Sequence, residues 1–196
     1  MDSVSYSLGI VLAANLKNQG FKSINSEELS KGFADSLEGS ASLTFEEADE
    51  KIREMMTKIQ EEKAAEAKSE GENFLTENAN NDGIEVTESG LQYNHSTLGI
   101  GDSPSAEDTV TVHYKGTLID GTEFDSSYKR GEPISFPLNG VISGWTEGLQ
   151  LMKIGGKTTF YIPQELAYGA NPSPNGPIPP YAALIFEVEL IDIKKA

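Results

Sequence analysis

The sequence of 196 residues contains no cysteine and only two histidines. The absence of cysteine excludes disulfides, thiolate nucleophiles and cysteine-ligated zinc sites. His95 and His113 lack the spacing of metal ligands, so we expect neither a metal ion nor a cofactor. The glycines form no phosphate-binding loop, and no serine lies in a Gly-x-Ser-x-Gly motif. Hydrolase, metalloenzyme and nucleotide-enzyme functions therefore lack the residues that they need.

Long apolar runs and clustered positive charge are also missing. No stretch approaches the roughly 20 apolar residues of a membrane span. The run from Gly9 to Leu16 is too short for one, and no basic region precedes it, so we predict no signal peptide. The formal net charge of −16 argues against nucleic acid, because phosphate binding needs clustered Lys and Arg. These features favour the cytoplasm, whereas removal of a signal peptide would place the protein in the periplasm or cell envelope.

The first half of the chain has no proline, since all nine prolines lie at or after Pro104. This distribution is expected if the half is mainly helical. Apolar residues recur at helical spacing over residues 4–16 and again over 29–37. We expect Ser26 to cap the second of these helices and Gly39 to end it.

A third helix begins at Thr44-Phe-Glu-Glu47, which has the pattern of a capping box. Its apolar stripe runs over residues 48–59 and then thins to alanines, while charges continue on every face. We therefore expect the second half to be a solvated stalk that ends at Asn80-Asn-Asp-Gly83. The domains that we predict are a helical dimerisation region at 1–43, the long helix at 44–83, and a C-terminal domain at 84–196.

The N-terminal helices form a poor core for a monomer. About 60 residues with narrow apolar stripes bury too little surface to fold comfortably without a partner. We therefore expect a homodimer in which stripes from two chains interleave. The alternative is that these helices fold back on the C-terminal domain.

The C-terminal half has the alternation of a β-sheet domain. Val110, Val112 and Tyr114 alternate with polar residues, which is the period of a half-buried strand, and Asp120-Gly121 is a hairpin signal. The single short helix is expected at Trp145–Met152. Because the strands follow one another through turns, we predict an α+β fold with an antiparallel sheet wrapped around that helix. Strands are expected at 91–98, 109–119, 122–126, 134–138, 157–163 and 184–193.

Several motifs in this half occur in a characteristic order. They are Gly121-Thr-Glu-Phe-Asp125, Gly144-Trp145, Gly155-Gly156-Lys157, Ala167-Tyr-Gly169, Ile178-Pro-Pro180 and the run Leu184–Leu190. Together they resemble the FKBP-type peptidyl-prolyl isomerase domain over residues 84–196. The order of the domains also resembles that of the Mip-like (macrophage infectivity potentiator-like) subgroup, in which a helical N-terminal domain is followed by a long helix and an isomerase domain. That resemblance implies a V-shaped homodimer joined through the N-terminal helices.

The resemblance also implies a proline pocket and a role for each of its residues. Trp145 would form the floor, and Asp125 would lie at the edge, where Arg130 pairs with or orients the aspartate and a tyrosine. The backbone N–H of Ile142 would hold the carbonyl beyond the proline. The walls would be Tyr114, Phe124, Val141, Ile142 and Phe186, and Tyr168 and Ile178 would come from a flexible loop at the rim.

Some positions depart from the family pattern or stay outside the pocket. Ile134 stands where many relatives have phenylalanine, so one wall of the pocket should be thinner. The loop Gly169–Pro177 is proline-rich and lacks the His-Pro of some relatives, which bears on substrate preference. We assign Phe136 to the core. Macrolide inhibitors are a further class of ligand that the resemblance implies.

A dry aromatic pocket suits the reaction that the resemblance implies. Resonance holds an amide planar with a barrier of roughly 18–20 kcal/mol, and the planar form carries charge separation that water stabilises and an apolar cavity does not. Such a pocket therefore favours the twisted amide. No step transfers a proton, so we expect Asp125 to position the peptide rather than to act as an acid or base.

The function that we predict is a peptidyl-prolyl isomerase that assists the folding of proline-containing polypeptides. Two alternatives remain open. The pocket could hold proline segments without turnover, as a binding module does. The N-terminal cleft could instead do the main work as a chaperone, with incidental isomerisation. An X–Pro isomerisation assay on the whole chain and on residues 84–196 separates these readings.

Overall fold

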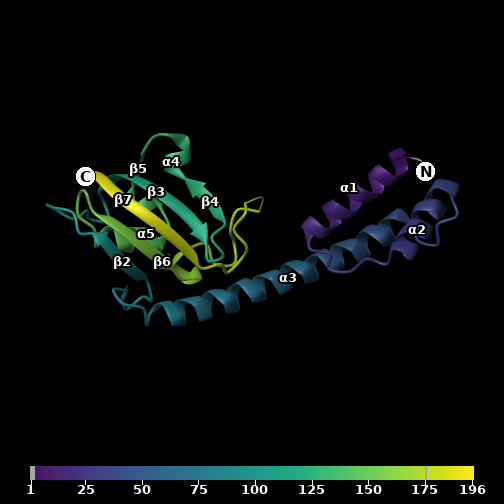
Figure 1. The fold of residues 1–196 in the computed structure, drawn as a ribbon, viewed down its shortest axis with the longest axis horizontal. Coiled ribbons are helices and arrows are strands. Elements are labelled where there is room, and N and C mark those ends of the chain that lie inside the picture. Colours follow the sequence, from purple (N-terminus) through teal and green to yellow (C-terminus); the bar gives the residue numbers. More distant parts are fainter. Residues whose placement is uncertain (1–2, 175) are drawn as a thin grey trace. The chain divides into compact units, whose positions relative to one another are not determined.

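The computed structural model describes residues 3–174 and 176–196, which divide into two compact units. The N-terminal unit ends at Glu62 and the C-terminal unit begins at Lys63. The break falls inside the long helix α3 (Phe45–Asn78), so that each unit holds about half of it (Figure 1).

The N-terminal unit contains α1 (Ser3–Gln19), α2 (Ser26–Glu38) and the first half of α3. The expected capping box is confirmed, because Thr44 Oγ1 accepts from the Glu47 N–H at 3.2 Å and Glu47 accepts from the Thr44 N–H at 2.8 Å. Gly39 ends α2 in the left-handed conformation, also as expected.

The cap of α2 differs from our expectation by one residue. The Asn25 side chain accepts from the N–H groups of Glu27 at 3.0 Å and Glu28 at 3.2 Å. Ser26 is therefore the first helical residue and not the cap. Both residue types are good caps, and the extended backbone of Asn25 places its oxygen over the exposed N–H groups.

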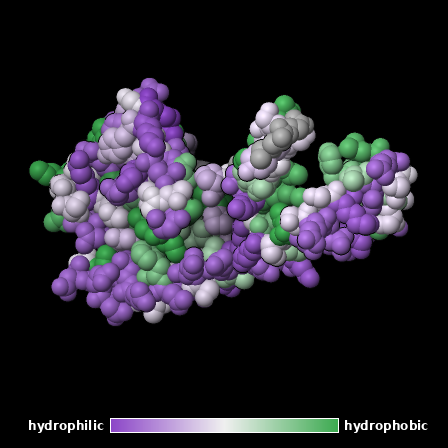
Figure 2. Space-filling view, turned by 45° about the vertical axis from the view of Figure 1, so that its right-hand side comes forward, coloured by the Kyte–Doolittle hydropathy of each residue, from purple (hydrophilic) through white to green (hydrophobic). Residues whose placement is uncertain are grey.

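The apolar faces of the N-terminal unit remain exposed. Neither α1 nor α2 has a buried residue. Leu8 is 65% exposed, Phe33 67% and Leu37 76%, and hydrophobic side chains lie open on this unit's surface (Figure 2). Within the described part of this unit, Ile59 of α3 is the one buried hydrophobic residue. A single chain therefore leaves these stripes uncovered.

The C-terminal unit is built on one antiparallel sheet, which confirms the predicted α+β class (Figure 1). Strands β3 and β7 pair along their whole length at its centre, and the order is β1-β2-β6-β7-β3-β4, with β5 also paired to β3. The strands are β1 (Glu85–Val86), β2 (Gln92–Thr97), β3 (Thr109–Leu118), β4 (Glu123–Ser126), β5 (Ile134–Pro137), β6 (Lys157–Ile162) and β7 (Leu184–Lys194). The helical segments are α4 (Ser127–Arg130), which we did not expect, α5 (Ser143–Leu149), and the 3-10 turns η1 (Leu138–Gly140) and η2 (Gln164–Leu166).

Helix α5 packs against the inner face of the sheet, and glycine permits the close approach. A Cβ on Gly148 would lie 2.6 Å from the Phe160 ring, a distance that no alanine could tolerate. We expected this helix at Trp145–Met152, but it begins two residues earlier and ends at Leu149. The chain tightens there, because the Met152 N–H donates to the Leu149 carbonyl three residues back.

The second half of α3 is not the solvated stalk that we expected. Asn78 is buried, and its Nδ2 donates to Gln92 Oε1 of β2 at 2.8 Å, while Gln92 Nε2 donates to the Leu75 carbonyl at 2.7 Å. Phe74 contacts the ring of Tyr161 on β6 with ring centroids 6.0 Å apart. Amide hydrogen bonds and one aromatic contact thus attach the helix to the sheet without a continuous apolar stripe.

Across residues 3–174 and 176–196, no helix has the length and apolar character required to cross a membrane. The same residues contain no group of three or more His, Asp or Glu placed to hold a metal ion.

Candidate active site

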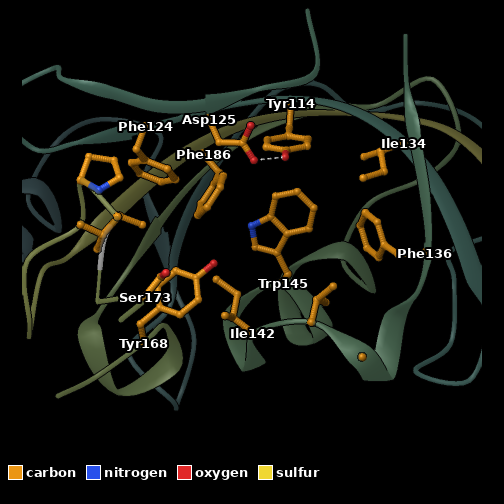
Figure 3. Close-up of a pocket in the computed structure, with 15 residues that line it drawn as sticks. Tyr114, Phe124, Asp125, Ile134, Phe136, Ile142, Trp145, Tyr168, Ser173 and Phe186 are labelled. Atoms are coloured by element: carbon orange, nitrogen blue, oxygen red, sulfur yellow. Dashed lines mark hydrogen bonds between the residues drawn. The ribbon is translucent and has the colours of Figure 1, made fainter. Parts of the chain in front are cut away.

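A cavity of about 720 Å³ opens beside α5, on the inner face of the sheet (Figure 3). Its lining is mainly aromatic and aliphatic, with a carboxylate and a few polar groups at the edge. The lining residues are Tyr114, Phe124, Asp125, Ile134, Phe136, Gly140, Val141, Ile142, Trp145, Tyr168, Ser173, Gly176, Pro177, Ile178 and Phe186.

Trp145, in the first turn of α5, forms the floor of this cavity. Its side chain is held by three rings: Phe186 at 5.0 Å and Tyr114 at 5.1 Å, both edge-on, and Phe136 at 5.3 Å between ring centroids. Phe124 in turn packs edge-on against Phe186 at 5.4 Å. Edge-to-face packing of this kind fixes the rings and leaves a rigid, apolar enclosure.

The indole N–H of Trp145 has no hydrogen-bond partner. Among the described residues, Trp145 Nε1 is the one buried side-chain nitrogen or oxygen without a partner. Figure 3 shows the nitrogen on the side of the ring that faces the middle of the cavity. Because buried donors are normally paired, an unpaired one at this position is available to a bound molecule.

A hydrogen-bonded set of three side chains forms the polar edge. The Tyr114 hydroxyl on β3 donates to Asp125 on β4 (Figure 3), two strands that pair side by side. Arg130, the last residue of α4, donates to Asp125 and also to the Tyr114 oxygen at 2.8 Å. Its guanidinium lies 5.4 Å from the Tyr114 ring centre. The short helix α4 thus places Arg130 against both partners.

The environment of these groups keeps their charge states constant near neutral pH. Burial tends to raise the pKa of Asp125, but the hydrogen bonds from Tyr114 and Arg130 outweigh it and hold that pKa below its usual value. Burial, together with the bond to the Asp125 carboxylate, raises the pKa of Tyr114 above its ordinary value. The edge therefore carries a carboxylate, a neutral phenol and a guanidinium.

The rim comes from the segment after β6. Tyr168 is 43% exposed and Ile178 is half-buried, and both line the cavity together with Ser173 and Pro177. Burial raises the pKa of Tyr168, and the charge of Asp125 adds to the shift, so the Tyr168 hydroxyl stays protonated. It can donate a hydrogen bond to a molecule in the cavity.

Ile142 immediately precedes α5 and is one of the residues that line the cavity. Its carbonyl accepts from the N–H groups of Trp145 at 2.9 Å and Thr146 at 3.1 Å. No described residue accepts a hydrogen bond from the Ile142 N–H. This donor is therefore open to a carbonyl in the cavity.

The structure brings together the residues that we singled out in the sequence. Nine of the ten line the cavity, and the tenth, Arg130, bonds to two of them. Ile134 also forms part of the wall. Phe136, which we assigned to the core, lines the cavity as well, and the alternation of β5 could have indicated this because Phe136 pairs with the inward-facing Val110. Ser173, Gly176 and Pro177 belong to the loop Gly169–Pro177, which we expected to bear on substrate preference, whereas no motif in the sequence pointed to Gly140.

Comparisons with known proteins agree with this geometry. Residues 101–191 match the family model "FKBP-type peptidyl-prolyl cis-trans isomerase", and residues 1–94 match "Domain amino terminal to FKBP-type peptidyl-prolyl isomerase". The FKBP-type peptidyl-prolyl cis-trans isomerase FkpA of Aeromonas hydrophila is 46% identical over 98% of this chain and 75% of its own length. Outer membrane protein MIP of Legionella longbeachae is 44% identical over 100% of this chain and 86% of its own length.

The solved structures give the same result. The crystal structure of FkpA from Escherichia coli matches with a TM-score of 0.80 and 39% identity, covering 99% of this chain and 94% of that one. The name of the Legionella relative gives no support to our preference for the cytoplasm. On the family models and the relatives together, the chain belongs to the FKBP-type peptidyl-prolyl cis-trans isomerases, in the subgroup of FkpA and MIP.

Proposed function

We propose that the cavity above Trp145 binds a proline ring and favours rotation about the preceding X–Pro bond. The observation that carries this proposal is a rigid aromatic enclosure with a single polar edge and two free N–H donors. The planar amide separates charge, which an apolar enclosure stabilises poorly. The twisted amide has lost that separation, so the pocket lowers the barrier of roughly 18–20 kcal/mol by binding the twisted state better than the planar one.

The two free donors act on different atoms of the peptide. The Ile142 N–H holds the carbonyl on the far side of the proline, which fixes one end while the other rotates. As the amide twists, resonance is lost and the lone pair returns to the proline nitrogen, which becomes an acceptor. The Trp145 N–H, which has no competing partner, can donate to that nitrogen. Such a bond exists only in the twisted state and is therefore catalytic.

The polar edge positions the peptide and takes no part in proton transfer. Asp125 stays ionised because Tyr114 and Arg130 both donate to it, and Tyr114 stays protonated because burial and the bond to Asp125 raise its pKa. Rotation about a C–N bond needs no proton. The carboxylate and the Tyr168 hydroxyl instead give the strained peptide fixed points of contact at the edge and rim.

We further propose that the enzyme is a homodimer joined through the N-terminal unit. The exposed side chains of Leu8, Phe33 and Leu37 support this, because stripes from two chains would cover each other. Two arms would then hold an unfolded, proline-containing polypeptide between two pockets and raise its effective concentration at each. Macrolide inhibitors are proposed as a further ligand of the same cavity.

The compartment is a separate proposal. The name "Outer membrane protein MIP" of one relative favours the cell envelope, the alternative that the sequence left open for a processed chain. Fractionation of the source cells followed by antibody detection tests this placement, and recovery in the cytosolic fraction alone would contradict it.

The experiment that tests the site is a protease-coupled assay of a short X–Pro peptide with the full chain. Phe124→Ala removes a half-buried wall of the cavity and should lower kcat/KM about tenfold or more. Phe45→Ala is the matched control, because Phe45 is 82% exposed at the start of α3 and lies outside the cavity. If the chain binds the peptide without accelerating its isomerisation, the protein is a binding module.

A further inference from the structure

The loop that carries the rim of the pocket is closed at its base by a strained clasp. The Tyr181 N–H donates to the Gly169 carbonyl at 2.8 Å, which ties the two ends of the loop together. Tyr181 has φ of 62°, and it is the one non-glycine residue with positive φ among those the structure describes. A tyrosine adopts this conformation only where its surroundings impose it.

Helix α3 touches the chain directly after this clasp. A Cβ on Gly71 would lie 3.1 Å from the Cβ and 3.3 Å from the backbone nitrogen of Ala183, which is tighter than ordinary van der Waals contact. Gly71 is buried although it lies in the interior of a helix, where glycine costs about 1 kcal/mol relative to alanine. Glycine at this position therefore lowers the helix propensity of α3 but allows close contact with Ala183, which follows the rim loop.

A second contact reaches Tyr181 itself. The Lys68 ammonium lies 5.9 Å from the centre of the Tyr181 ring, within the range of a cation–π interaction. Lys68, Gly71, Phe74 and Asn78 recur at spacings of three or four residues, so they share one face of α3. That face is the one that contacts the sheet domain, and its first two members contact the loop exit.

The link from the clasp to the pocket is short and stiff. Ile178, which lines the cavity, is separated from Tyr181 only by Pro179 and Pro180. Each proline ring fixes its own φ, so this segment has few ways to absorb a movement of the clasp. A shift of Tyr181 therefore moves Ile178, and through the bond to Gly169 it also moves Tyr168, the other rim residue.

We propose that residues 68–78 of α3 form a positioning element for the pocket rim. By holding Tyr181 and Ala183 they fix where Tyr168 and Ile178 lie, and so they set the affinity for the peptide and the preference for the residue before proline. This inference rests on the proposed function of the cavity. Lys68 and Gly71 are positioning residues, since neither lines the cavity.

The test uses the full chain and a series of peptides that differ only in the residue before proline. Lys68→Met removes the cation and keeps much of the stem, and we expect KM to rise about two- to fivefold with kcat within twofold of wild type. The rise should differ between peptides, because we propose that the rim contacts the residue before proline. Lys68→Arg keeps the cation and should restore the wild-type values.

Gly71→Ala tests the same contact from the helix side. Its new Cβ would push on Ala183, so KM and peptide preference should change even though alanine favours helix. Two control variants are matched. Lys68 also forms an ion pair with Glu72 four residues later, so Lys31→Met is the lysine control, because it removes the equivalent pair with Asp35 in α2; Gly32→Ala lies in α2 where a Cβ would meet open space. Neither control should change KM.

The outcomes separate the inference from the function on which it rests. If the wild-type chain isomerises no peptide, the proposed function fails. If the wild type is active but Lys68→Met and Gly71→Ala keep its KM and peptide preference, the positioning role is overturned. It is also overturned if both variants lower kcat equally for every peptide, or if Lys68→Arg fails to restore KM, because those results indicate a general structural effect.

Discussion

The two units of this chain treat apolar side chains in opposite ways. In the C-terminal unit, Leu91, Phe160 and Leu184 are fully buried between the sheet and α5. In the N-terminal unit, Phe33 and Leu37 are more than 60% exposed, and two of its helices bury nothing. The C-terminal unit has a complete hydrophobic core, whereas α1 and α2 of the N-terminal unit leave their apolar side chains exposed. The cavity and the proposed dimer interface therefore lie in separate parts of the chain.

The largest expected effect is on oligomeric state. Phe33→Glu places a charge in the exposed apolar face of α2 and should convert a dimer to a monomer, because two such carboxylates cannot be buried without partners. Ile100→Glu is the control, since Ile100 is 87% exposed in the C-terminal unit and should leave the dimer intact. Sedimentation at micromolar concentration measures both. A wild-type chain that sediments as a monomer would refute the proposed assembly.

Removal of the N-terminal unit should separate two activities. A chain of residues 63–196 keeps the pocket and the docked half of α3, so turnover of a short X–Pro peptide should change little. Refolding of a protein limited by a slow prolyl bond should slow about tenfold or more, because the second pocket and the cleft are lost. Circular dichroism establishes that the shortened chain is folded. If the shortened chain lost the same factor of activity in both assays, the N-terminal unit would only stabilise the C-terminal unit.

Asp125→Ala should do the reverse. It removes the carboxylate to which both Tyr114 and Arg130 donate, and kcat/KM for a short peptide should fall about 10- to 100-fold, as expected for a bond to a charged group. Binding of an unfolded polypeptide should persist, because we propose that the N-terminal unit of the dimer holds it. Asp102→Ala, an exposed acid of the same unit, serves as the control. Unchanged peptide turnover would remove Asp125 from the site.

A smaller effect should follow the loss of one N–H in the pocket. Trp145 is the only tryptophan in the chain, so a benzothienyl analogue, which has sulfur in place of the N–H, can replace it cleanly. We expect kcat to fall about two- to tenfold with KM unchanged, since the bond forms only in the twisted state. An unchanged melting temperature, measured by circular dichroism, controls for packing. A kcat equal to that of the wild type would mean that the unpaired N–H has no catalytic role.

The smallest expected effect is that of pH. The pKa of Asp125 is lowered in the folded protein, so the stability that its ionised form contributes is complete above the unfolded pKa of about 4. This stability is lost only as the pH falls through the lower folded pKa. The pKa of Tyr114 is raised in the folded protein, so the stability that its protonated form contributes is complete below the unfolded pKa of about 10. This stability is lost as the pH rises through the higher folded pKa. Peptide kcat/KM should therefore be flat from about pH 5 to pH 9. A bell-shaped profile within that range would point to proton transfer.

Local pattern was enough to find most of the fold. The alternation of Val110, Val112 and Tyr114 marks a strand because one face of the sheet is buried and the other is not. The capping box at Thr44 is legible because all of its bonds lie within four residues. The cap of α2 was misplaced by one residue, since Asn25 and Ser26 are both good caps and the choice depends on the path of the preceding chain.

The sequence is sufficient to predict most residues that line the cavity, but not how far the cavity extends over the sheet. The aromatic residues and Asp125 were found because they stand in ordered motifs. Residue type alone does not separate the core from the cavity wall at Phe136, because an inward-facing residue on β5 can meet either α5 or the open cavity. That choice depends on where α5 stops covering the sheet, and α5 itself ends three residues before the position that we expected.

The composition and motif order of the chain are sufficient for its fold class, its family and most of its pocket, because those features depend on residue type and short-range spacing. The docking of α3 was invisible at that level. Its contacts use a glycine, two side-chain amides and a lysine over a tyrosine ring, and none of these adds to an apolar stripe. Two of the partners, Tyr181 and Ala183, lie more than a hundred residues away in the chain, so the surface that holds the second half of α3 exists only in the packed domain.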